Sequence, residues 1–164
     1  MARFLLVGGG CRGLGLARLL TAEGHAVRVT TRTEEGRSAV EAAGAECWIG
    51  DPDRVGTLRY ALESVTALCW LLGTATGPAA HVAALHDTRL EMMLARTIDT
   101  TVRGVVYEAA GTVAPDALAR GAQVVREVAT RSGIPVEVLT APPDELEVWT
   151  AATRDAIGRL LGIV

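Results

Sequence analysis

A short apolar run that leads directly into a cluster of glycines constrains the fold of this chain more than any other feature. Residues 4–7 are all apolar, four of the next six residues are glycines, and an apolar helical pattern begins at Leu14. A strand, a tight glycine turn and a helix in this order form the first unit of a fold in which strands alternate with helices. The opening of the chain therefore predicts an α/β protein.

The spacing of the glycines predicts a ligand for this turn. Gly8, Gly10 and Gly13 fit the pattern G-x-G-x-x-G, with Cys11 and Arg12 between the last two. In such a loop the first glycine allows the tight turn, the second lets a pyrophosphate approach the backbone, and the third lets the helix pack closely on the strand. The N-terminus of the helix offers free N–H groups to the phosphates. We expect a bound dinucleotide; the alternative is a strand–helix turn without a ligand.

The same alternation continues along the chain. Strand patterns cover residues 4–7, 25–31, 45–49, 65–72, 103–108 and 135–139. Helical patterns cover residues 13–23, 33–43, 54–62, 84–99, 115–132 and 149–161. Strands that alternate with helices require a mostly parallel sheet with right-handed crossovers. The prediction is one domain over residues 1–164, a doubly wound Rossmann sheet of about six strands in the order 3-2-1-4-5-6.

Composition excludes several classes of function. A net charge of −3 gives no electrostatic reason to expect nucleic acid or an anionic membrane as partner. No apolar run approaches the length of a membrane span, and the first residues do not resemble a signal peptide. The spacing of the three cysteines matches no zinc or redox motif, so we expect no metal. An odd number of cysteines without a signal peptide favours the reducing cytoplasm.

Residues at the ends of the predicted strands favour NADP as the dinucleotide. Sites that prefer NAD usually have a carboxylate at the end of the second strand, where this chain has Arg32. A guanidinium there can pair with a 2′-phosphate, and Arg12 adds a second positive charge. Asp51 is a candidate partner for the adenine amino group or a turn residue, and Leu72 and Gly73 should pass beside the second ribose. NAD remains the alternative.

The order of these motifs resembles the short-chain dehydrogenase/reductase superfamily. The likeness rests on the glycine loop, on Gly50 and Asp51 after the third strand, on residues 105–108, and on residues 129–139. The chain is most similar to the atypical members related to sugar-nucleotide epimerases and NmrA-type NADP-binding proteins. This resemblance covers nearly the whole chain and implies a Rossmann fold that binds NAD(P).

The chain departs from this family where the family performs its chemistry. Active members use Tyr-x-x-x-Lys, but all 16 basic residues here are arginines, so neither Tyr60 nor Tyr107 has the lysine. Ala109 and Ala110 replace the Ser/Thr pair of the family. The longer members also have a C-terminal substrate-binding region that has no counterpart in this sequence. The resemblance therefore implies that the chain binds NAD(P), but the catalytic residues of the family have no counterparts in this sequence.

Other residues are candidates for proton transfer. Tyr107 and Glu108 end the fifth strand, at the edge where such sheets bind ligands, and His81 and His86 follow the fourth strand. The sequence predicts an NADP-preferring binder, a sensor or accessory protein with weak or no dehydrogenase activity. The alternative is an NADP-dependent oxidoreductase or epimerase-like enzyme that uses non-standard residues or a partner subunit.

The end of the chain presents a further apolar face. Trp149 is expected just before the last helix, and the face continues through Ile157, Leu160, Leu161, Ile163 and Val164. This face either packs on the sheet or contributes to a homodimer contact.

Overall fold

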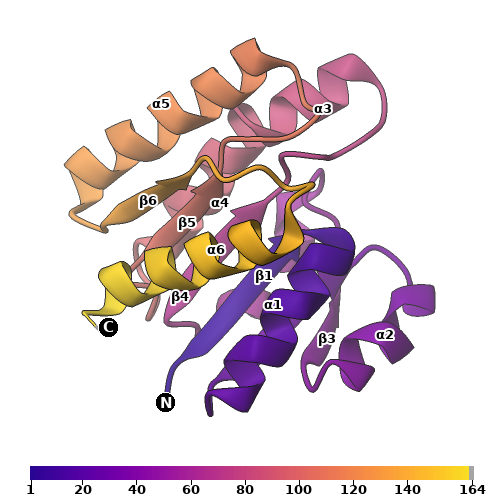
Figure 1. Cartoon of the computed structure of the whole chain (residues 1–164). Helices are drawn as coiled ribbons and strands as arrows, with labels where there is room; N and C mark the ends of the chain where they lie inside the picture. The colour runs from indigo at the N-terminus through magenta and orange to yellow at the C-terminus, as the bar shows by residue number, and fades with distance from the viewer. Residues whose placement is uncertain (163–164) are drawn as a thin grey trace.

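Six parallel strands form a single twisted sheet in the computed structural model, which describes residues 1–162 (Figure 1). The strand order is β3-β2-β1-β4-β5-β6, as predicted. The strands are β1 (Arg3–Gly8), β2 (Ala26–Thr31), β3 (Glu46–Ile49), β4 (Ala67–Leu71), β5 (Val105–Glu108) and β6 (Val136–Leu139). The order reverses between β1 and β4, so the crevice at this switch point is where the fold binds its ligands.

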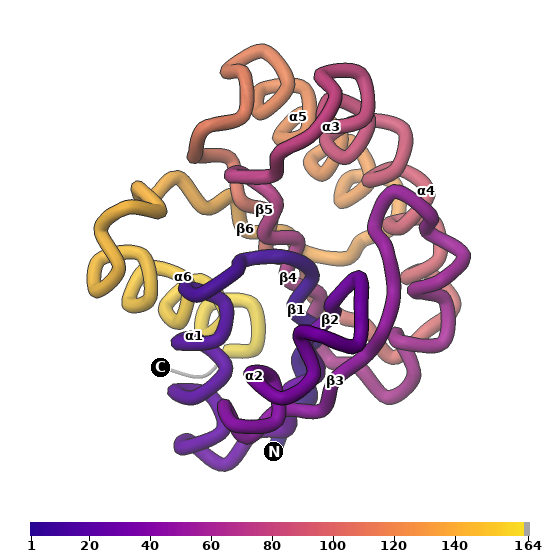
Figure 2. The backbone as a smooth tube through the Cα atoms, turned by 90° about the vertical axis from the view of Figure 1, so that its right-hand side faces the viewer, coloured from indigo at the N-terminus to yellow at the C-terminus, as the bar shows by residue number. Residues whose placement is uncertain are grey.

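Helices cover both faces of the sheet. One face carries α1 (Gly10–Ala22), α2 (Arg37–Ala42) and α6 (Leu146–Leu161), which pack on one core cluster. The other carries α3 (Ala79–Leu85), α4 (Thr88–Thr97) and α5 (Pro115–Ser132), which pack on a second cluster. Figure 2 shows α6 beside α1, although the two helices come from opposite ends of the chain. The central strand β4 is buried along its whole length, as its apolar sequence predicts.

The structure corrects the prediction of a single helix over residues 54–62. Two short 3₁₀ helices stand there, η2 (Val55–Leu58) and η3 (Tyr60–Leu62). The Thr57 hydroxyl donates to the Arg54 carbonyl at 2.7 Å, and the Trp48 indole N–H donates to the Thr57 carbonyl at 2.9 Å. Because side chains take carbonyl groups that an α-helix would use, the segment tightens into separate turns.

Two other helical boundaries also differ from the predictions. The helix expected over residues 84–99 is divided into α3 and α4, because the chain breaks at His86 and Asp87. The last helix begins at Leu146, three residues before Trp149, which lies inside it and is fully buried. Its apolar face therefore packs on the sheet, while the predicted contributions of Ile163 and Val164 lie outside the described residues.

Helix α5 confirms how well local signals can define an element. It begins at Pro115, whose fixed φ suits the first turn, and ends before Gly133, which adopts φ 76°. No helix within residues 1–162 is long and apolar enough to cross a membrane.

Candidate functional site

The glycine loop forms the tight turn that the sequence predicts. Gly8, Gly9 and Gly10 have φ angles of 81°, 92° and 52°, a conformation that residues with side chains rarely adopt. A Cβ on Gly13 would lie 3.0 Å from the Gly8 carbonyl oxygen, whereas a Cβ on Gly10 would meet nothing within 4 Å. The third glycine thus allows close packing of helix on strand, and the second leaves open space beside the backbone, as the motif requires.

Helix α1 begins at Gly10 and directs its first N–H groups to the same open space. Gly10 and Cys11 are exposed, and no side chain caps this end of the helix. The unpaired N–H groups and the positive end of the helix dipole favour an anion here. The geometry suits a pyrophosphate.

On one side of the loop, the end of β2 places a cation at the edge of the sheet. Arg32 follows β2, and its side chain is 56% exposed. Its Nε lies 3.7 Å from Oδ1 of Asp51, which also accepts the backbone N–H of Asp53 at 2.9 Å. The structure therefore brings together two of the predicted site residues, Arg32 and Asp51, in an open, loosely paired arrangement.

On the other side of the loop, Arg12 reaches across the ends of β4 and β5. Its Nη2 and Nε donate to the two carboxylate oxygens of Glu108 at 2.6 and 3.1 Å. Its Nη1 donates to the carbonyl of Gly9 at 3.1 Å and to the hydroxyl of Thr74 at 3.0 Å. The Arg12 charge is thus paired and directed away from Arg32, and its predicted contribution to a 2′-phosphate site is not supported by this arrangement.

Glu108 is completely buried and accepts four hydrogen bonds. Besides Arg12, the backbone N–H of Gly73 donates at 2.8 Å and the indole N–H of Trp149 donates at 2.7 Å. The Arg12 guanidinium also lies over the Trp149 ring, 5.3 Å from its centroid. We call Arg12, Gly73, Thr74, Glu108 and Trp149 the Arg12–Glu108 network. It connects α1, the ends of β4 and β5, and α6.

Sequence reasoning missed Trp149 and Thr74 as members of this network. One signal was present: a carboxylate at the end of a buried strand must find a cation, and a buried indole N–H must find an acceptor. The sequence does not show that Glu108 meets both needs, since its partners lie far apart along the chain.

A cavity of about 510 Å³ opens beside the network. Its wall includes Arg12 and Thr74, the loop after β5 with Gly111 and Thr112, and the loop after β6 with Thr140 and residues 142–144. The cavity lies at the carboxyl edge of the sheet, next to the glycine loop. A ligand held at the loop can therefore extend into it.

Tyr107, the other predicted catalytic residue, faces the opposite side of the sheet. It is fully buried, and its hydroxyl lies 2.7 Å from Nδ1 of His86 and 3.3 Å from the Leu118 carbonyl. Nε2 of His86 lies 3.0 Å from the Leu72 carbonyl, which can only accept. Nε2 therefore carries the proton, and the Tyr107 hydroxyl donates to Nδ1.

Burial determines the protonation of this pair. It lowers the pKa of His86 below the ordinary 6.5, although the bond to Leu72 and the charge of Glu108 act in the opposite direction. Burial also raises the pKa of Tyr107, and the nearby Glu108 charge adds to the effect. Both groups are therefore neutral near pH 7.

The predicted proton-transfer group is not assembled in one place. His86 and Tyr107 meet, but Glu108 lies on the other face of the sheet, and exposed His81 lies 3.6 Å from Asp53. The remaining cofactor candidates, Leu72 and Gly73, do follow β4 beside the crevice. Residues 1–162 contain no cluster of side chains that could hold a metal ion.

Comparison with known proteins yields only structural relatives. No family model matches the sequence, and no curated protein matches it. Among solved structures, a short-chain dehydrogenase/reductase superfamily protein from Agrobacterium tumefaciens with bound NAD is 16% identical, with a TM-score of 0.69 over 84% of this chain and 48% of the other.

Two further structures show the same similarity. UDP-glucuronic acid 4-epimerase from Bacillus cereus in complex with NAD is 10% identical, with a TM-score of 0.69 over 84% of this chain and 55% of the other. Vestitone reductase from alfalfa is 16% identical, with a TM-score of 0.63 over 85% and 56%. The chain spans about half the length of these proteins. The resemblance to the short-chain dehydrogenase/reductase superfamily is thereby confirmed at the level of the fold: the chain has the six-stranded Rossmann architecture that these proteins share with it.

Proposed function

We propose that this protein binds a dinucleotide at the carboxyl edge of its sheet, with the pyrophosphate at the N-terminus of α1. The geometry of the glycine loop carries the proposal, because Gly10 leaves open space where the phosphates would approach, beside the free N–H groups of the helix. The bound NAD in two structures of the same fold supports it.

The dinucleotide that this site prefers is NADP. Arg32 is exposed at the end of β2, and its 3.7 Å pairing with Asp51 is loose enough for a phosphate to replace. An exposed ion pair of this kind contributes about 0–1 kcal/mol, whereas a guanidinium–phosphate pair forms stronger, bidentate hydrogen bonds. NAD, which has only a hydroxyl at this position, would gain nothing from the arginine.

The protein acts as a sensor or accessory binder with weak or no dehydrogenase activity. The sequence has no lysine for a Tyr-x-x-x-Lys motif. Tyr107 is buried with its hydroxyl bonded to His86, and Glu108 is buried with four hydrogen bonds. Neither side chain is accessible to a substrate in this conformation.

An alternative function is an NADP-dependent oxidoreductase or epimerase-like enzyme with non-standard residues or a partner subunit. The cavity of about 510 Å³ beside Arg12 favours it, because it is large enough for a small substrate next to the cofactor. The hydroxyl groups of Thr74, Thr112 and Thr140 line this cavity and are candidates for binding a substrate.

Titration with NADPH and NADH, followed by fluorescence, tests the binding proposal. We expect NADPH to bind with a Kd below about 1 mM and Arg32→Ala to weaken it by about ten-fold, since a charge-assisted pair is lost. The affinity for NADH should change by less than about two-fold. An equal loss for both cofactors would remove the 2′-phosphate assignment, and no binding of either would overturn the proposal.

A pair of glycine variants separates binding from backbone strain. Gly10 and Gly24 both have positive φ, and a Cβ on either would meet no atom within 4 Å. Gly10→Ala and Gly24→Ala should both destabilise the fold by about 1–2 kcal/mol or more, and Gly24→Ala at least as much as Gly10→Ala, since φ 90° at Gly24 lies further from the left-handed region than φ 52° at Gly10. Only Gly10→Ala should weaken NADPH binding, because only Gly10 lies at the phosphate position.

Turnover assays address the alternative. Aldehydes, quinones and sugar nucleotides are offered with NADPH, and the oxidation of the cofactor is followed by absorbance. Turnover that Tyr107→Phe leaves unchanged would exclude Tyr107 as the proton donor. Absence of turnover, together with NADPH binding, is the result that the binder proposal expects.

A further inference from the structure

A second cavity, of about 820 Å³, lies at the opposite edge of the sheet from the glycine loop. Two segments line it: residues 59–64, which lead into β4, and residues 95–101, which lead from α4 toward β5. Both segments precede their strands, so this cavity is at the amino edge of the sheet. Nothing in the proposed dinucleotide site involves it.

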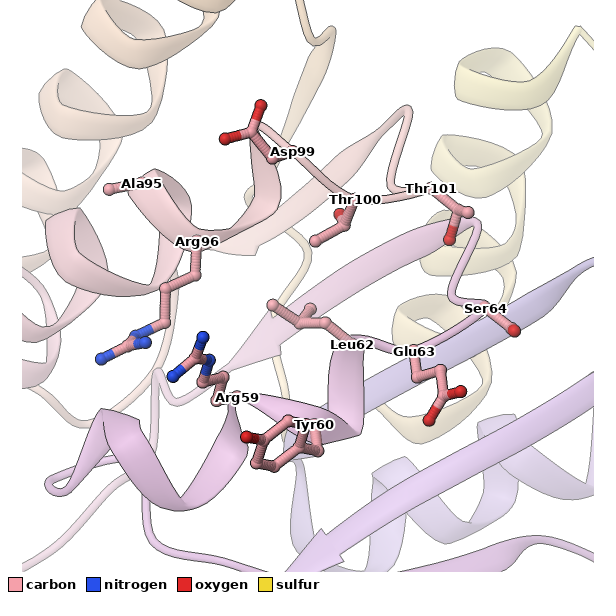
Figure 3. A pocket seen from close by; sticks show the side chains of 10 residues that line it. All are labelled: Arg59, Tyr60, Leu62, Glu63, Ser64, Ala95, Arg96, Asp99, Thr100 and Thr101. Carbon is pink, nitrogen blue, oxygen red and sulfur yellow. The ribbon is translucent and has the colours of Figure 1, made fainter.

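Two arginines on the wall of this cavity lack a counter-charge. Figure 3 shows the guanidinium groups of Arg59 and Arg96 directed toward one another at the same end of the cavity. Within residues 1–162, neither forms an ion pair or a side-chain hydrogen bond, whereas Arg89 on the same helix as Arg96 pairs with Asp53. Two adjacent cations without a carboxylate repel one another, and a bound anion would remove this repulsion.

The carboxylates that line the same cavity do not neutralise the two arginines. Glu63 and Asp99 line the cavity, but Figure 3 shows their carboxylates directed away from the two guanidinium groups. The C-terminus of α4 favours one cation, Arg96, in its last turn. Arg59 is not at the C-terminus of an α-helix, and its guanidinium carbon lies 5.5 Å from the centroid of the Tyr60 ring.

The rest of the wall offers groups that suit a polar organic ligand. Tyr60 is 67% exposed, a large exposure for an aromatic side chain. Ser64, Thr100 and Thr101 also line it, and the hydroxyls of Thr100 and Thr101 already donate to the carbonyls of Thr97 and Val65, at 2.7 Å each. Ser64 has φ 61° and is the only residue other than glycine with positive φ within the described chain. Such backbone outliers in a residue with a side chain often accompany functional sites.

We propose that this cavity binds a small phosphorylated molecule, with its phosphate held between Arg59 and Arg96. The planar guanidinium groups match the oxygens of a phosphate, and two of them balance its charge of about −2. The volume is in the range of small-ligand sites, so the organic part of the ligand fits between the two segments.

Isothermal titration calorimetry of the full chain with pyrophosphate, ribose 5-phosphate and AMP tests this proposal and distinguishes an inorganic from an organic phosphate. We expect at least one of them to bind with a Kd below about 1 mM. Arg59→Ala and Arg96→Ala should each weaken this binding by about ten-fold, since each removes a charge-assisted contact. Arg59→Lys should restore part of it, because the charge returns without the planar fork.

Two matched variants identify the site that binds. Arg126→Ala removes an exposed arginine of α5 that has no carboxylate partner among residues 1–162 and does not line the cavity, and Gly10→Ala alters the phosphate position of the glycine loop. Both should leave the affinity within about two-fold of that of the unmodified protein. The proposal is overturned if none of the three probes binds, if Arg59→Ala and Arg96→Ala leave binding unchanged, or if Arg126→Ala weakens it equally.

Discussion

The two halves of the carboxyl edge use charged side chains in opposite ways. At the end of β2, Arg32 and Asp51 are 56% and 33% exposed and only loosely paired. At the ends of β4 and β5, Arg12 and Glu108 are 10% and 0% exposed, and every oxygen of the carboxylate is hydrogen-bonded. The first half keeps its charged side chains exposed to solvent, whereas the second half buries its charges and uses them to hold the fold together.

Among substitutions at these sites, removal of the Glu108 carboxylate should lower the stability of the protein most. In Glu108→Ala, the Arg12 guanidinium, the Gly73 N–H and the Trp149 N–H remain buried without their acceptor. We expect the free energy of unfolding to fall by about 3–5 kcal/mol, the cost of leaving one buried charge unpaired. Denaturation in urea, monitored by circular dichroism, measures this change.

A surface carboxylate provides the control for that experiment. Glu34 is 71% exposed and pairs with Arg37 at 2.7 Å, so Glu34→Ala should lower the free energy of unfolding far less than Glu108→Ala does. Similar losses for Glu108→Ala and Glu34→Ala would show that the Arg12–Glu108 network is no stronger than a surface pair.

Tyr107→Phe should have the next largest effect. The change removes the 2.7 Å hydrogen bond to His86 and leaves Nδ1 of that histidine buried without a donor. The free energy of unfolding should fall by about 1–3 kcal/mol, as measured by the same denaturation. NADPH affinity should not change, because Tyr107 faces the side of the sheet away from the network; a parallel loss of affinity would contradict this separation of the two faces.

The buried His86 should also make the free energy of unfolding depend on pH, with a smaller effect than the substitutions above. Because burial lowers the pKa of His86 in the folded protein below 6.5, the unfolded chain takes up a proton first as the pH falls. The free energy of unfolding is therefore highest above pH 6.5, and it decreases as the pH falls from 6.5 toward the pKa of His86 in the folded protein. From pH 7.5 to 5.5, the slope from one proton reaches at most about 1.4 kcal/mol per pH unit.

Substitution of His86 tests whether this residue is the source of the slope. His86→Gln should flatten the dependence in urea titrations at several pH values, although the variant is less stable at every pH. His25→Gln serves as the comparison, since that histidine is only partly buried. A slope that persists unchanged in His86→Gln would assign the effect to other groups.

The sequence predicts the fold of this protein more completely than its site. Strand order, the glycine turn and the bounds of α5 follow from local signals: apolar runs, Gly8 to Gly13, Pro115 and Gly133. The division of residues 54–62 into two 3₁₀ helices could not be predicted, because it depends on bonds from Trp48 and Thr57 to carbonyl groups of the segment. Periodicity does not report such side-chain competition.

The candidate site shows the same limit. Arg32 and Asp51 lie where strand ends place them, so a count of strands was sufficient to bring them together. Arg12 and Glu108 were both singled out, but their pairing was not predicted, since sequence position does not give the direction of a side chain. The roles assigned to Gly8, Gly10, Cys11, Gly13, Leu72 and Gly73 in cofactor binding remain predictions for the titrations above.

The Arg12–Glu108 network also has a consequence for how the chain folds. Arg12 and Glu108 are 96 residues apart, and Trp149 joins from a further 41 residues along. Contacts between such distant segments need most of the sheet in place, so we expect them to be weak or absent in the transition state for folding. The network should therefore lower the rate of unfolding and leave the rate of folding nearly unchanged. It would then give the native state kinetic stability.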